Sequence, residues 1–439
     1  MFRASAALSL ALVVVATVLG WRALDRVDDR VVGIGGMLNG VSFSPYQRDQ
    51  DPLAERHPSL ADIDRDLSVL AGKVRAVRTY STLNDLDKVP ELAVKYDMKV
   101  VAGAWVDQRA QRSEREIANL IRMVRRNPGT VERVLVGNEA VLRGDLRVPQ
   151  LVSYIRQVKR NVNVPVSTAE PWHVWKDEKE LVAAVDYIAI HVLPYWEGMA
   201  VEEALAFLVA RYNELRELYP TKRIIITEVG WPSDGRLRRD AVASRANQAR
   251  FMREFIALAR ASNIDYFVME AFDQPWKHRI EGEAGAYWGL FDSGRRGKWR
   301  RQGAVRPRRE GRAGAAARIA LAIAPMLLFF RRWRDLRPAG ELFFAGLIQL
   351  CAAVVVWTAW SGLSAYHSGG MLAGWIVLFL CLAGTLLLVL MQALEMTEVL
   401  WLRRWRRVFQ PARADDRQHW PKVSLHLPIC NEPPEMVRI

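Results

Sequence analysis

The sequence predicts an α/β protein: a (β/α)8 TIM barrel followed by a helical transmembrane region. Short β-branched runs alternate with helix-like segments between residues 40 and 292, and eight such units over about 250 residues is the usual size of this barrel. Several runs end in polar and aromatic residues, as strands do at the active end of such a barrel. Three long apolar segments after residue 312 predict the membrane region.

The amino-acid composition limits which classes of binding partner the protein is expected to have. The chain has 439 residues, 25% charged and 51% hydrophobic, which suits a globular domain plus membrane segments. The net charge is +14, and the stretch Arg295–Arg312 alone contributes +8, from nine Lys/Arg and one Glu. The rest is only mildly basic, so no nucleic-acid partner is expected. Because the basic stretch adjoins an apolar segment, its expected partner is the lipid bilayer.

The sequence has few cysteines and histidines, the residues that most often bind metals or form disulfides. The three cysteines, Cys351, Cys381 and Cys430, all follow the predicted barrel, and the seven histidines show no metal-ligand spacing. We therefore expect no disulfide framework, no metal site and no cofactor.

The N-terminal segment, residues 1–30, contains an apolar run from Ala4 to Gly20 behind Arg3. Such a run can be a cleaved signal peptide or a signal anchor. No clear A-x-A cleavage site follows it, which favours an uncleaved anchor.

The barrel is expected over residues 40–292. A doubly wound open sheet is the alternative, but it usually has a Gly-rich phosphate loop after its first strand, and none is present. The predicted strands are Gly40–Ser44, Val74–Arg78, Lys99–Gly103, Arg133–Gly137, Val164–Thr168, Tyr187–His191, Arg223–Thr227 and Asp265–Met269. The predicted helices between them include Leu60–Leu70, Ser113–Arg126, Val148–Arg160, Val201–Leu218 and Ser244–Ala261.

The membrane region is expected over residues 313–400, with about three helices at Ala313–Phe330, Leu342–Tyr366 and Met371–Leu394. The loops that follow the first and third helices are strongly basic, and the positive-inside rule places both in the cytoplasm. The barrel would then be extracytoplasmic and residues 401–439 cytoplasmic. The basic linker 293–312 would lie outside, against the outer lipid surface, unless the first of these helices does not span.

Two of the predicted strands run out into a glutamate. The segment R-I-I-I-T-E-V-G-W-P carries Glu228, and V-L-V-G-N-E carries Glu139. Retaining glycoside hydrolysis needs two carboxyl groups about 5 Å apart, one as acid/base and one as nucleophile. We assign Glu139 as the acid/base and Glu228 as the nucleophile, although either glutamate alone could be a solvated strand end or an ion-pair partner.

Further polar and aromatic residues follow the strands, as a sugar site requires. Asn138 can donate to a sugar 2-hydroxyl. Glu170 and Glu270 compete for the catalytic roles, and we interpret them as hydrogen-bonding substrate. Any single aromatic residue could equally be a core residue. The predicted substrate-binding residues are Tyr80, Trp105, Asn138, Glu170, Trp172, His191, Tyr195, Trp231, Glu270 and Trp276.

Five motifs carry a resemblance to a known family: G-V-S-F-S-P-Y, V-R-T-Y-S-T, V-G-N-E-A, T-E-V-G-W-P and A-F-D-Q-P-W-K. Together they resemble glycoside hydrolase family 17, and more closely its bacterial periplasmic branch, which is fused to a family 2 membrane glycosyltransferase in β-1,3/1,6-glucan synthases. The resemblance covers about Gly40 to Asp292. It implies a retaining enzyme acting on β-1,3-glucan in the inner membrane, with a periplasmic barrel and the roles assigned above to Glu139 and Glu228.

The segment Lys422–Val437 resembles the opening of a family 2 glycosyltransferase domain, where a nucleotide-sugar would bind. No acidic D-x-D metal motif follows, so we expect no transfer from a nucleotide-sugar by this chain. Two functions stay open. The barrel is a β-glucan hydrolase or transglycosylase, or it is a non-catalytic module that binds the glucan made by the fused transferase.

Overall fold

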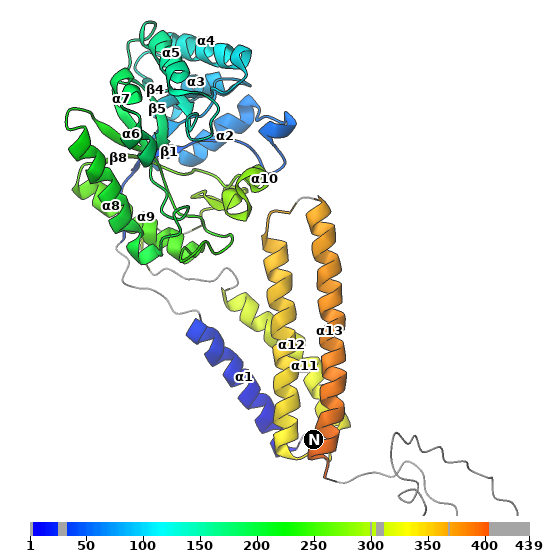
Figure 1. The fold of residues 1–439 in the computed structure, drawn as a ribbon. Coiled ribbons are helices and arrows are strands. Elements are labelled where there is room, and N and C mark those ends of the chain that lie inside the picture. Colours follow the sequence, from blue (N-terminus) through cyan, green and yellow to red (C-terminus); the bar gives the residue numbers. More distant parts are fainter. Residues whose placement is uncertain (1–2, 25–32, 299–300, 304–310, 368, 404–439) are drawn as a thin grey trace, which may run out of the picture.

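The computed structural model describes residues 3–24, 33–298, 301–303, 311–367 and 369–403. Figure 1 shows a barrel at one end of the molecule and a bundle of long helices at the other. The predicted transferase segment lies outside the described residues.

The strands form a closed barrel in the order β1 to β8, with every neighbouring pair parallel. The predicted fold class is therefore confirmed, and each predicted strand corresponds to one in the structure. The strands are β1 Leu38–Ser42, β2 Val74–Arg78, β3 Lys99–Ala104, β4 Val131–Asn138, β5 Val166–Pro171, β6 Ile188–His191, β7 Ile224–Val229 and β8 Asp265–Val268.

The helices around the barrel follow the apolar periodicity of the sequence, since each buries one face against the strands. Ser59 begins α2 with a capping box to Asp62, which satisfies the first backbone donors of that helix. The α-helices are α2 Leu60–Leu70, α3 Val89–Ala93, α4 Ala110–Arg126, α5 Val148–Lys159, α6 Trp172–Asp177, α7 Lys179–Ala184, α8 Val201–Leu218, α9 Arg245–Ala261 and α10 His278–Glu281. Short 3-10 turns lie at Pro52–Ala54, Leu86–Lys88, Val94–Tyr96, Pro275–Lys277 and Glu283–Tyr287.

The barrel interior is packed rather than open. A buried cluster combines small residues such as Ala76 and Ala189 with the large rings of Tyr187 and Phe267. Gly40 makes room for Phe267, because a Cβ there would lie 2.4 Å from the ring. The interior is therefore closed to ligands along most of its length, and chemistry is confined to its ends.

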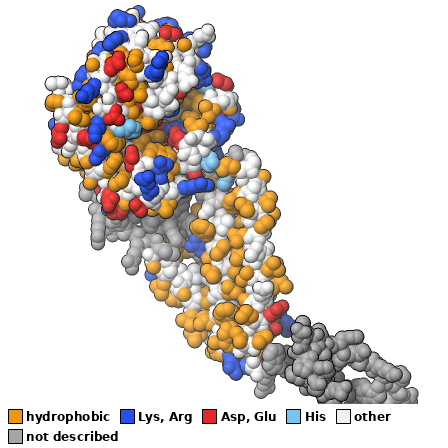
Figure 2. Space-filling model, in the orientation of Figure 1, with side chains coloured by type: hydrophobic (Ala, Val, Ile, Leu, Met, Phe, Trp, Pro, Cys, Tyr) orange, Lys and Arg blue, Asp and Glu red, His pale blue; other side chains and the backbone are white. Residues whose placement is uncertain are grey.

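Four further helices form the bundle: α1 Ala4–Leu24, α11 Gly311–Arg332, α12 Pro338–Ser364 and α13 Gly369–Trp401. All four are long and apolar enough to cross a membrane. Figure 2 shows a largely hydrophobic surface along them, whereas charged side chains are spread over the barrel. The apolar segments predicted from the sequence are therefore helices of this length and composition.

The N-terminal helix α1 is part of the bundle. Ala6 and Val13 are buried in one cluster with residues of α11 and α12, including Met326 and Phe344. The guanidinium of Arg3 lies 3.7 Å from Asp335 and 3.8 Å from Glu341. The helix α1 therefore covers apolar surface of α11 and α12, and its retention as an uncleaved anchor stays a prediction.

The predicted linker 293–312 begins inside the folded barrel, which corrects the boundary at residue 292. Arg295 donates to both carboxylate oxygens of Asp66, at 2.8 and 2.5 Å. The ammonium group of Lys298 is buried and lies 2.6 Å from Asp273. These two cations therefore hold the barrel together and are not available to a lipid surface. The prediction erred because charge counts do not show which residues are paired.

The turn between α12 and α13 contacts the barrel. The hydroxyl of Tyr366 donates to Asp273 and accepts from the backbone N–H of Ser293, both at 3.0 Å. Its ring stacks on Tyr287, with centroids 4.9 Å apart, and Figure 1 shows this turn close to α10. Asp273 and Tyr287 follow β8, so the bundle meets the barrel at the carboxyl ends of the strands.

Candidate active site

The end of β4 is shaped to present Glu139. Gly137 has φ 94° and Glu139 has φ 56°, both left-handed. A side chain at position 137 would also meet Val106, Thr168 and Leu151 at 3.1 to 3.3 Å, so glycine is required there. The register between β4 and β5 shifts in this region. Such irregularities redirect side chains, and they are frequent beside active sites.

The structure brings Glu139 and Glu228 together. One carboxylate oxygen of each lies within 4.8 Å of the other and of a ring nitrogen of His191. Glu228 is buried at the end of β7, whereas Glu139 is a quarter exposed. This separation matches the short spacing of a retaining glycosidase, in which the second carboxylate attacks the sugar directly.

Glu228 is held as a carboxylate. Its Oε1 accepts from the guanidinium of Arg78 at 2.7 Å and from the hydroxyl of Tyr80 at 2.9 Å. Burial alone would raise the pKa of Glu228, but the positive charges of His191 and Arg78 outweigh it and bring the pKa to about 2. Because these groups lie against Oε1, Oε2 is left to attack a sugar carbon.

Arg78 also positions Asn138, since its second guanidinium nitrogen donates to the side-chain carbonyl of that asparagine. The amide NH2 group is not used in this contact, and its donation to a sugar hydroxyl stays a prediction. Arg78 was missed from the sequence. A charge at the end of the otherwise alternating strand V-R-A-V-R was the signal that could have found it.

His191 lies between the two glutamates instead of facing substrate, which corrects its predicted role. Its Nδ1 is 2.8 Å from Oε1 of Glu139, and its Nε2 is 3.6 Å from Oε1 of Glu228. The three residues are close enough to hold a metal ion. However, the guanidinium of Arg78 already occupies Oε1 of Glu228, and its charge would repel a cation. The donor set thus suits a catalytic pair better than a metal centre.

Glu170 is a supporting residue, which corrects its prediction as a substrate ligand. It is fully buried, and its two oxygens accept from the backbone N–H groups of Val141 and Leu142, at 2.9 and 3.2 Å. These contacts hold the turn that follows Glu139. Burial raises the pKa of Glu170 to about 7, against the backbone hydrogen bonds that lower it.

Glu270 is also paired within the protein. The ammonium group of Lys277 lies 2.9 and 3.0 Å from its two oxygens, and both groups are buried. Burial raises the pKa of Glu270 to about 7, although the charge of Lys277 opposes it. Lys277 therefore holds both oxygens of Glu270 in the free protein, and the binding of substrate by Glu270 stays a prediction.

Two residues beyond β8 were missed. Lys277 is the last residue of the motif A-F-D-Q-P-W-K, and Glu281 is the last residue of α10. Burial raises the pKa of Glu281, with Lys277 opposing and the charges of Glu228 and Glu139 adding to the rise. Oε2 of Glu281 is buried without a hydrogen-bond partner in the described part of the chain. It is therefore a further group that a ligand could satisfy.

Four predicted aromatic residues, Tyr80, Trp105, Trp172 and Trp276, remain partly exposed. The guanidinium of Arg143 lies over the ring of Trp105 at 4.3 Å, and that of Arg211 lies over Trp172 at 4.7 Å. Stacking of these rings on glucose stays a prediction.

Tyr195 and Trp231 are packing residues, contrary to the prediction. Each is at most 1% exposed, and their ring centroids are 5.8 Å apart in an edge-to-face contact. Their polar atoms donate to the backbone carbonyls of Arg236 and Val242. Neither ring can reach a sugar, because Tyr195 also packs against Trp288 and Trp231 packs against Phe251 of α9.

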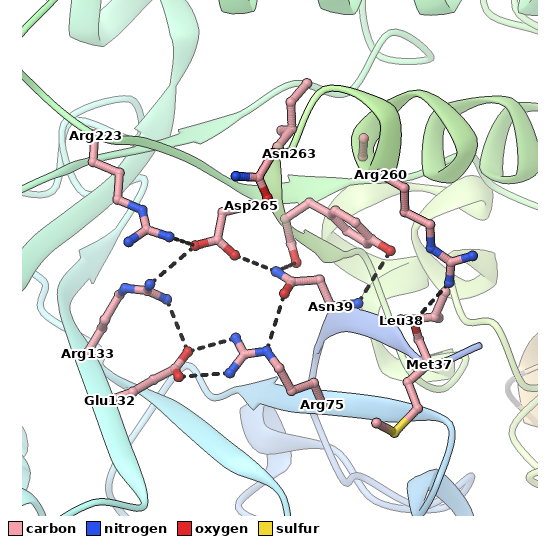
Figure 3. Close-up of a pocket in the computed structure, with 13 residues that line it drawn as sticks. Met37, Leu38, Asn39, Arg75, Glu132, Arg133, Arg223, Arg260, Asn263 and Asp265 are labelled. Carbon is pink, nitrogen blue, oxygen red and sulfur yellow. Dashed lines mark hydrogen bonds and ion pairs between the residues drawn. The ribbon is translucent and has the colours of Figure 1, made fainter. Parts of the chain in front are cut away.

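A cavity lies at the opposite end of the barrel, where the strands begin (Figure 3). It measures about 690 Å³ and is lined by charged residues that include Arg75, Glu132, Arg223 and Asp265. None of the predicted site residues lines it.

Comparison with known proteins agrees with this geometry. Residues 40–289 match the model of the BtgE/BtgC glycoside hydrolase domain. The chain belongs to this family.

Among curated relatives, glucan endo-1,3-beta-glucosidase btgC of Emericella nidulans is 28% identical over 314 residues, which are 62% of this chain and 48% of that protein. The probable glucan endo-1,3-beta-glucosidase btgC of Aspergillus fumigatus is 31% identical over 295 residues, 58% of this chain and 42% of that protein. The chain thus spans about half the length of the curated relatives it matches.

Among solved structures, the glycoside hydrolase family 17 β-1,3-glucanosyltransferase of Rhizomucor miehei is 26% identical, with a TM-score of 0.53. The match covers 59% of this chain and 95% of that one. An endo-laminarinase from Formosa, 19% identical with a TM-score of 0.52, shares the fold. The predicted membership of a family 17-like glycoside hydrolase group is thereby confirmed for the barrel.

Proposed function

We propose that the barrel is a retaining β-1,3-glucan hydrolase or transglycosylase. The observation that carries the proposal is the pair Glu139 and Glu228, whose oxygens lie within 4.8 Å, with Glu228 kept ionised by Arg78. The relatives named glucan endo-1,3-beta-glucosidase, and the Rhizomucor miehei glucanosyltransferase, of which an active-site mutant was solved with laminaritriose, support a β-1,3-glucan substrate. A module that only binds glucan would need aromatic rings but not this charge arrangement.

The chemistry proceeds in two steps. Oε2 of Glu228 forms a bond to the anomeric carbon while the glycosidic bond breaks, and Glu139 gives its proton to the departing oxygen. In the second step Glu139 takes a proton from water or from a sugar hydroxyl, whose oxygen displaces Glu228 from the same carbon. Water yields hydrolysis and a sugar hydroxyl yields transfer. The net configuration at the anomeric carbon is retained.

The test incubates the full chain, in detergent, with laminari-oligosaccharides that carry a label at the reducing end. Product sizes and linkages are then measured. Shorter products indicate hydrolysis and longer products indicate transfer, and either result supports the proposal. An unchanged oligosaccharide, with laminaritriose still bound, would instead support a binding module.

We further propose that α1, α11, α12 and α13 anchor the barrel in a bacterial inner membrane, with the barrel in the periplasm. Arg3, Arg331, Arg332 and Arg334 lie at the end of the bundle away from the barrel, and the positive-inside rule assigns that end to the cytoplasm. The turn that carries Tyr366 contains no Lys or Arg between α12 and α13. Residues 401–439 would then be cytoplasmic, and Lys422–Val437 would begin the transferase domain that the resemblance implies.

Cysteine labelling in intact cells tests this topology. An introduced Asp177→Cys on the barrel, where residue 177 is exposed, should react with an impermeant maleimide, whereas Cys430 should react only after permeabilisation. Cys351 and Cys381 are replaced by serine in both samples. Labelling of Cys430 alone in intact cells would reverse the orientation.

A further inference from the structure

His191 is the one buried ring that contacts both catalytic glutamates in the described part of the chain. It ends β6, and β6 pairs with β7 in a register that sets His191 opposite Glu228. The register shifts between Ile190 and His191, which turns the imidazole toward the strand ends. Nδ1 then reaches Glu139 at 2.8 Å and Nε2 approaches Glu228 at 3.6 Å.

The hydrogen bonding of this ring is incomplete. Its side chain is 2% exposed, and Nε2 is buried without a hydrogen-bond partner among the described residues. A buried polar nitrogen without a partner is costly. The contact at 3.6 Å is too long for a hydrogen bond but lies within reach of one after a small movement. The ring is therefore hydrogen-bonded to Glu139 and lies close to Glu228 without a hydrogen bond to it.

The charges around the ring are mostly acidic. Glu139 lies at the end of β4, Glu170 on β5 and Glu228 on β7. Arg78 and Tyr80 both donate to Glu228. Beyond β8, Lys277 and Glu281 face the same set. Three carboxyl groups surround one imidazole, and each of its ring nitrogens can carry an N–H group that donates to a carboxylate.

The two-step reaction moves one negative charge across this ring. Before the first step Glu228 is ionised and Glu139 carries a proton. After it, Glu228 is a neutral ester and Glu139 is ionised, because its proton has gone to the departing oxygen. The second step returns the charge to Glu228. The ring thus touches the charged group in both states.

We propose that His191 is a positioning residue that couples the two glutamates by stabilising whichever is ionised. This rests on the proposed function. Nε2–H faces Glu228 in the free enzyme and Nδ1–H faces Glu139 in the glycosyl-enzyme. The ring gives up no proton in either step. Its contact uses Oε1 of Glu139, so Oε2 is the oxygen that transfers the proton.

The test compares His191→Gln with the wild type on two substrates, using the full chain in detergent. One is a laminari-oligosaccharide, whose leaving group needs protonation. The other is a β-laminaribioside of a dinitrophenol, whose leaving group does not. We expect kcat/KM to fall about 10²-fold on the oligosaccharide, within the usual range for acid–base catalysis, and less than tenfold on the activated substrate. The alkaline limb of the kcat profile should also move by at least one pH unit.

The matched control is His57→Gln, because His57 contacts Glu55 at 3.0 Å and neither catalytic glutamate. It should change neither substrate preference nor the pH profile. If His191→Gln does not fold, His191→Asn replaces it, and failure of both to fold would make the ring a packing residue and overturn the proposal. Equal losses on both substrates with an unmoved pH profile would overturn it as well. A wild type inert on both substrates would instead overturn the proposed function, and this inference with it.

Discussion

Both ends of the barrel carry clusters of charged side chains, and the clusters differ in how fully their polar atoms are paired. At the end where the strands begin, the guanidinium of Arg75 binds both oxygens of Glu132 at 2.9 and 3.0 Å (Figure 3). Arg133 joins Glu132 to Asp265, and Arg223 lies 2.8 Å from Asp265. At the other end, His191, Arg78, Trp172 and Glu281 each keep a buried polar atom without a partner, within the described residues.

The volume of a cavity alone therefore does not indicate a functional site. The 690 Å³ cavity is lined by ions that already bind one another, and none of the atoms of that ion-pair network is left buried and unpartnered among the described residues. Such a network stabilises the fold, as expected at the amino-terminal end of barrel strands. At the opposite end, by contrast, several buried polar atoms have no partner among the described residues, and such atoms call for a functional explanation.

The largest expected effect is that of Glu228→Gln. The amide keeps the shape of the side chain but cannot form the glycosyl-enzyme. Turnover of laminari-oligosaccharides should fall by roughly 10⁴-fold or more, and binding of laminaritriose should persist. Steady-state rates beside calorimetric titration measure both. Near wild-type turnover would remove Glu228 from the nucleophile role.

Glu139→Ala should lower turnover by about 10² to 10⁴-fold on oligosaccharides, because the departing oxygen loses its proton donor. Aryl glucosides with good leaving groups should be partly spared, and azide should rescue the second step as a glycosyl azide. Rates with and without azide provide the measurement. Losses of the same size on every substrate, without rescue, would contradict the assignment.

Glu132→Gln changes a glutamate near the start of β4, the strand whose far end carries Glu139. Removing this carboxylate leaves Arg75 without its charged partner, and we expect a loss of about 1 kcal/mol, since both side chains are partly exposed. For a domain of this size that corresponds to roughly 2 to 4 °C in melting temperature. Turnover should stay within about twofold of the wild type, because Glu132 lies at the start of β4, at the end of the barrel away from Glu139 and Glu228. A large loss of turnover with unchanged melting would indicate that the charged cavity takes part in function.

Glu170→Gln should produce the smallest change, visible in the pH dependence of stability. The pKa of Glu170 is raised from 4.5 to about 7 in the folded state. Its contribution to stability is therefore fully present below pH 4.5 and is lost as the pH rises through about 7. Replacing it with glutamine should flatten the wild-type decline across this window. Thermal melts at half-unit pH steps test this, and parallel curves for the two proteins would contradict it.

The sequence predicted the strands well because β-branched runs bounded by turn residues have the period of strands, and consecutive βα units leave few topologies. It also pointed to Glu139 and Glu228, since each directly follows such a run, and the structure brings the two carboxylates together. It could not find the pairing of Glu170 with backbone donors or of Glu270 with Lys277. Those contacts depend on how neighbouring strand ends meet in space.

The aromatic residues illustrate the same limit. Trp231 and Trp276 both follow a strand end, yet Trp231 is buried against Tyr195 and Trp276 is partly exposed. Nothing in the local sequence distinguishes a ring that covers the barrel wall from one that faces substrate. The same reasoning applies to Arg295 and Lys298, whose partners Asp66 and Asp273 are far away in the chain.

The proposed mechanism requires that Glu228 becomes covalently attached to a sugar. The direct measurement is mass spectrometry of peptides after incubating the full chain with an activated 2-deoxy-2-fluoro-β-laminaribioside, which slows the second step more than the first. A 2-fluoro-laminaribiosyl group on Glu228, absent in Glu228→Gln and formed in the His57→Gln control, is the predicted result. A label on another residue, or turnover of laminari-oligosaccharides without any labelling of Glu228, would contradict the account.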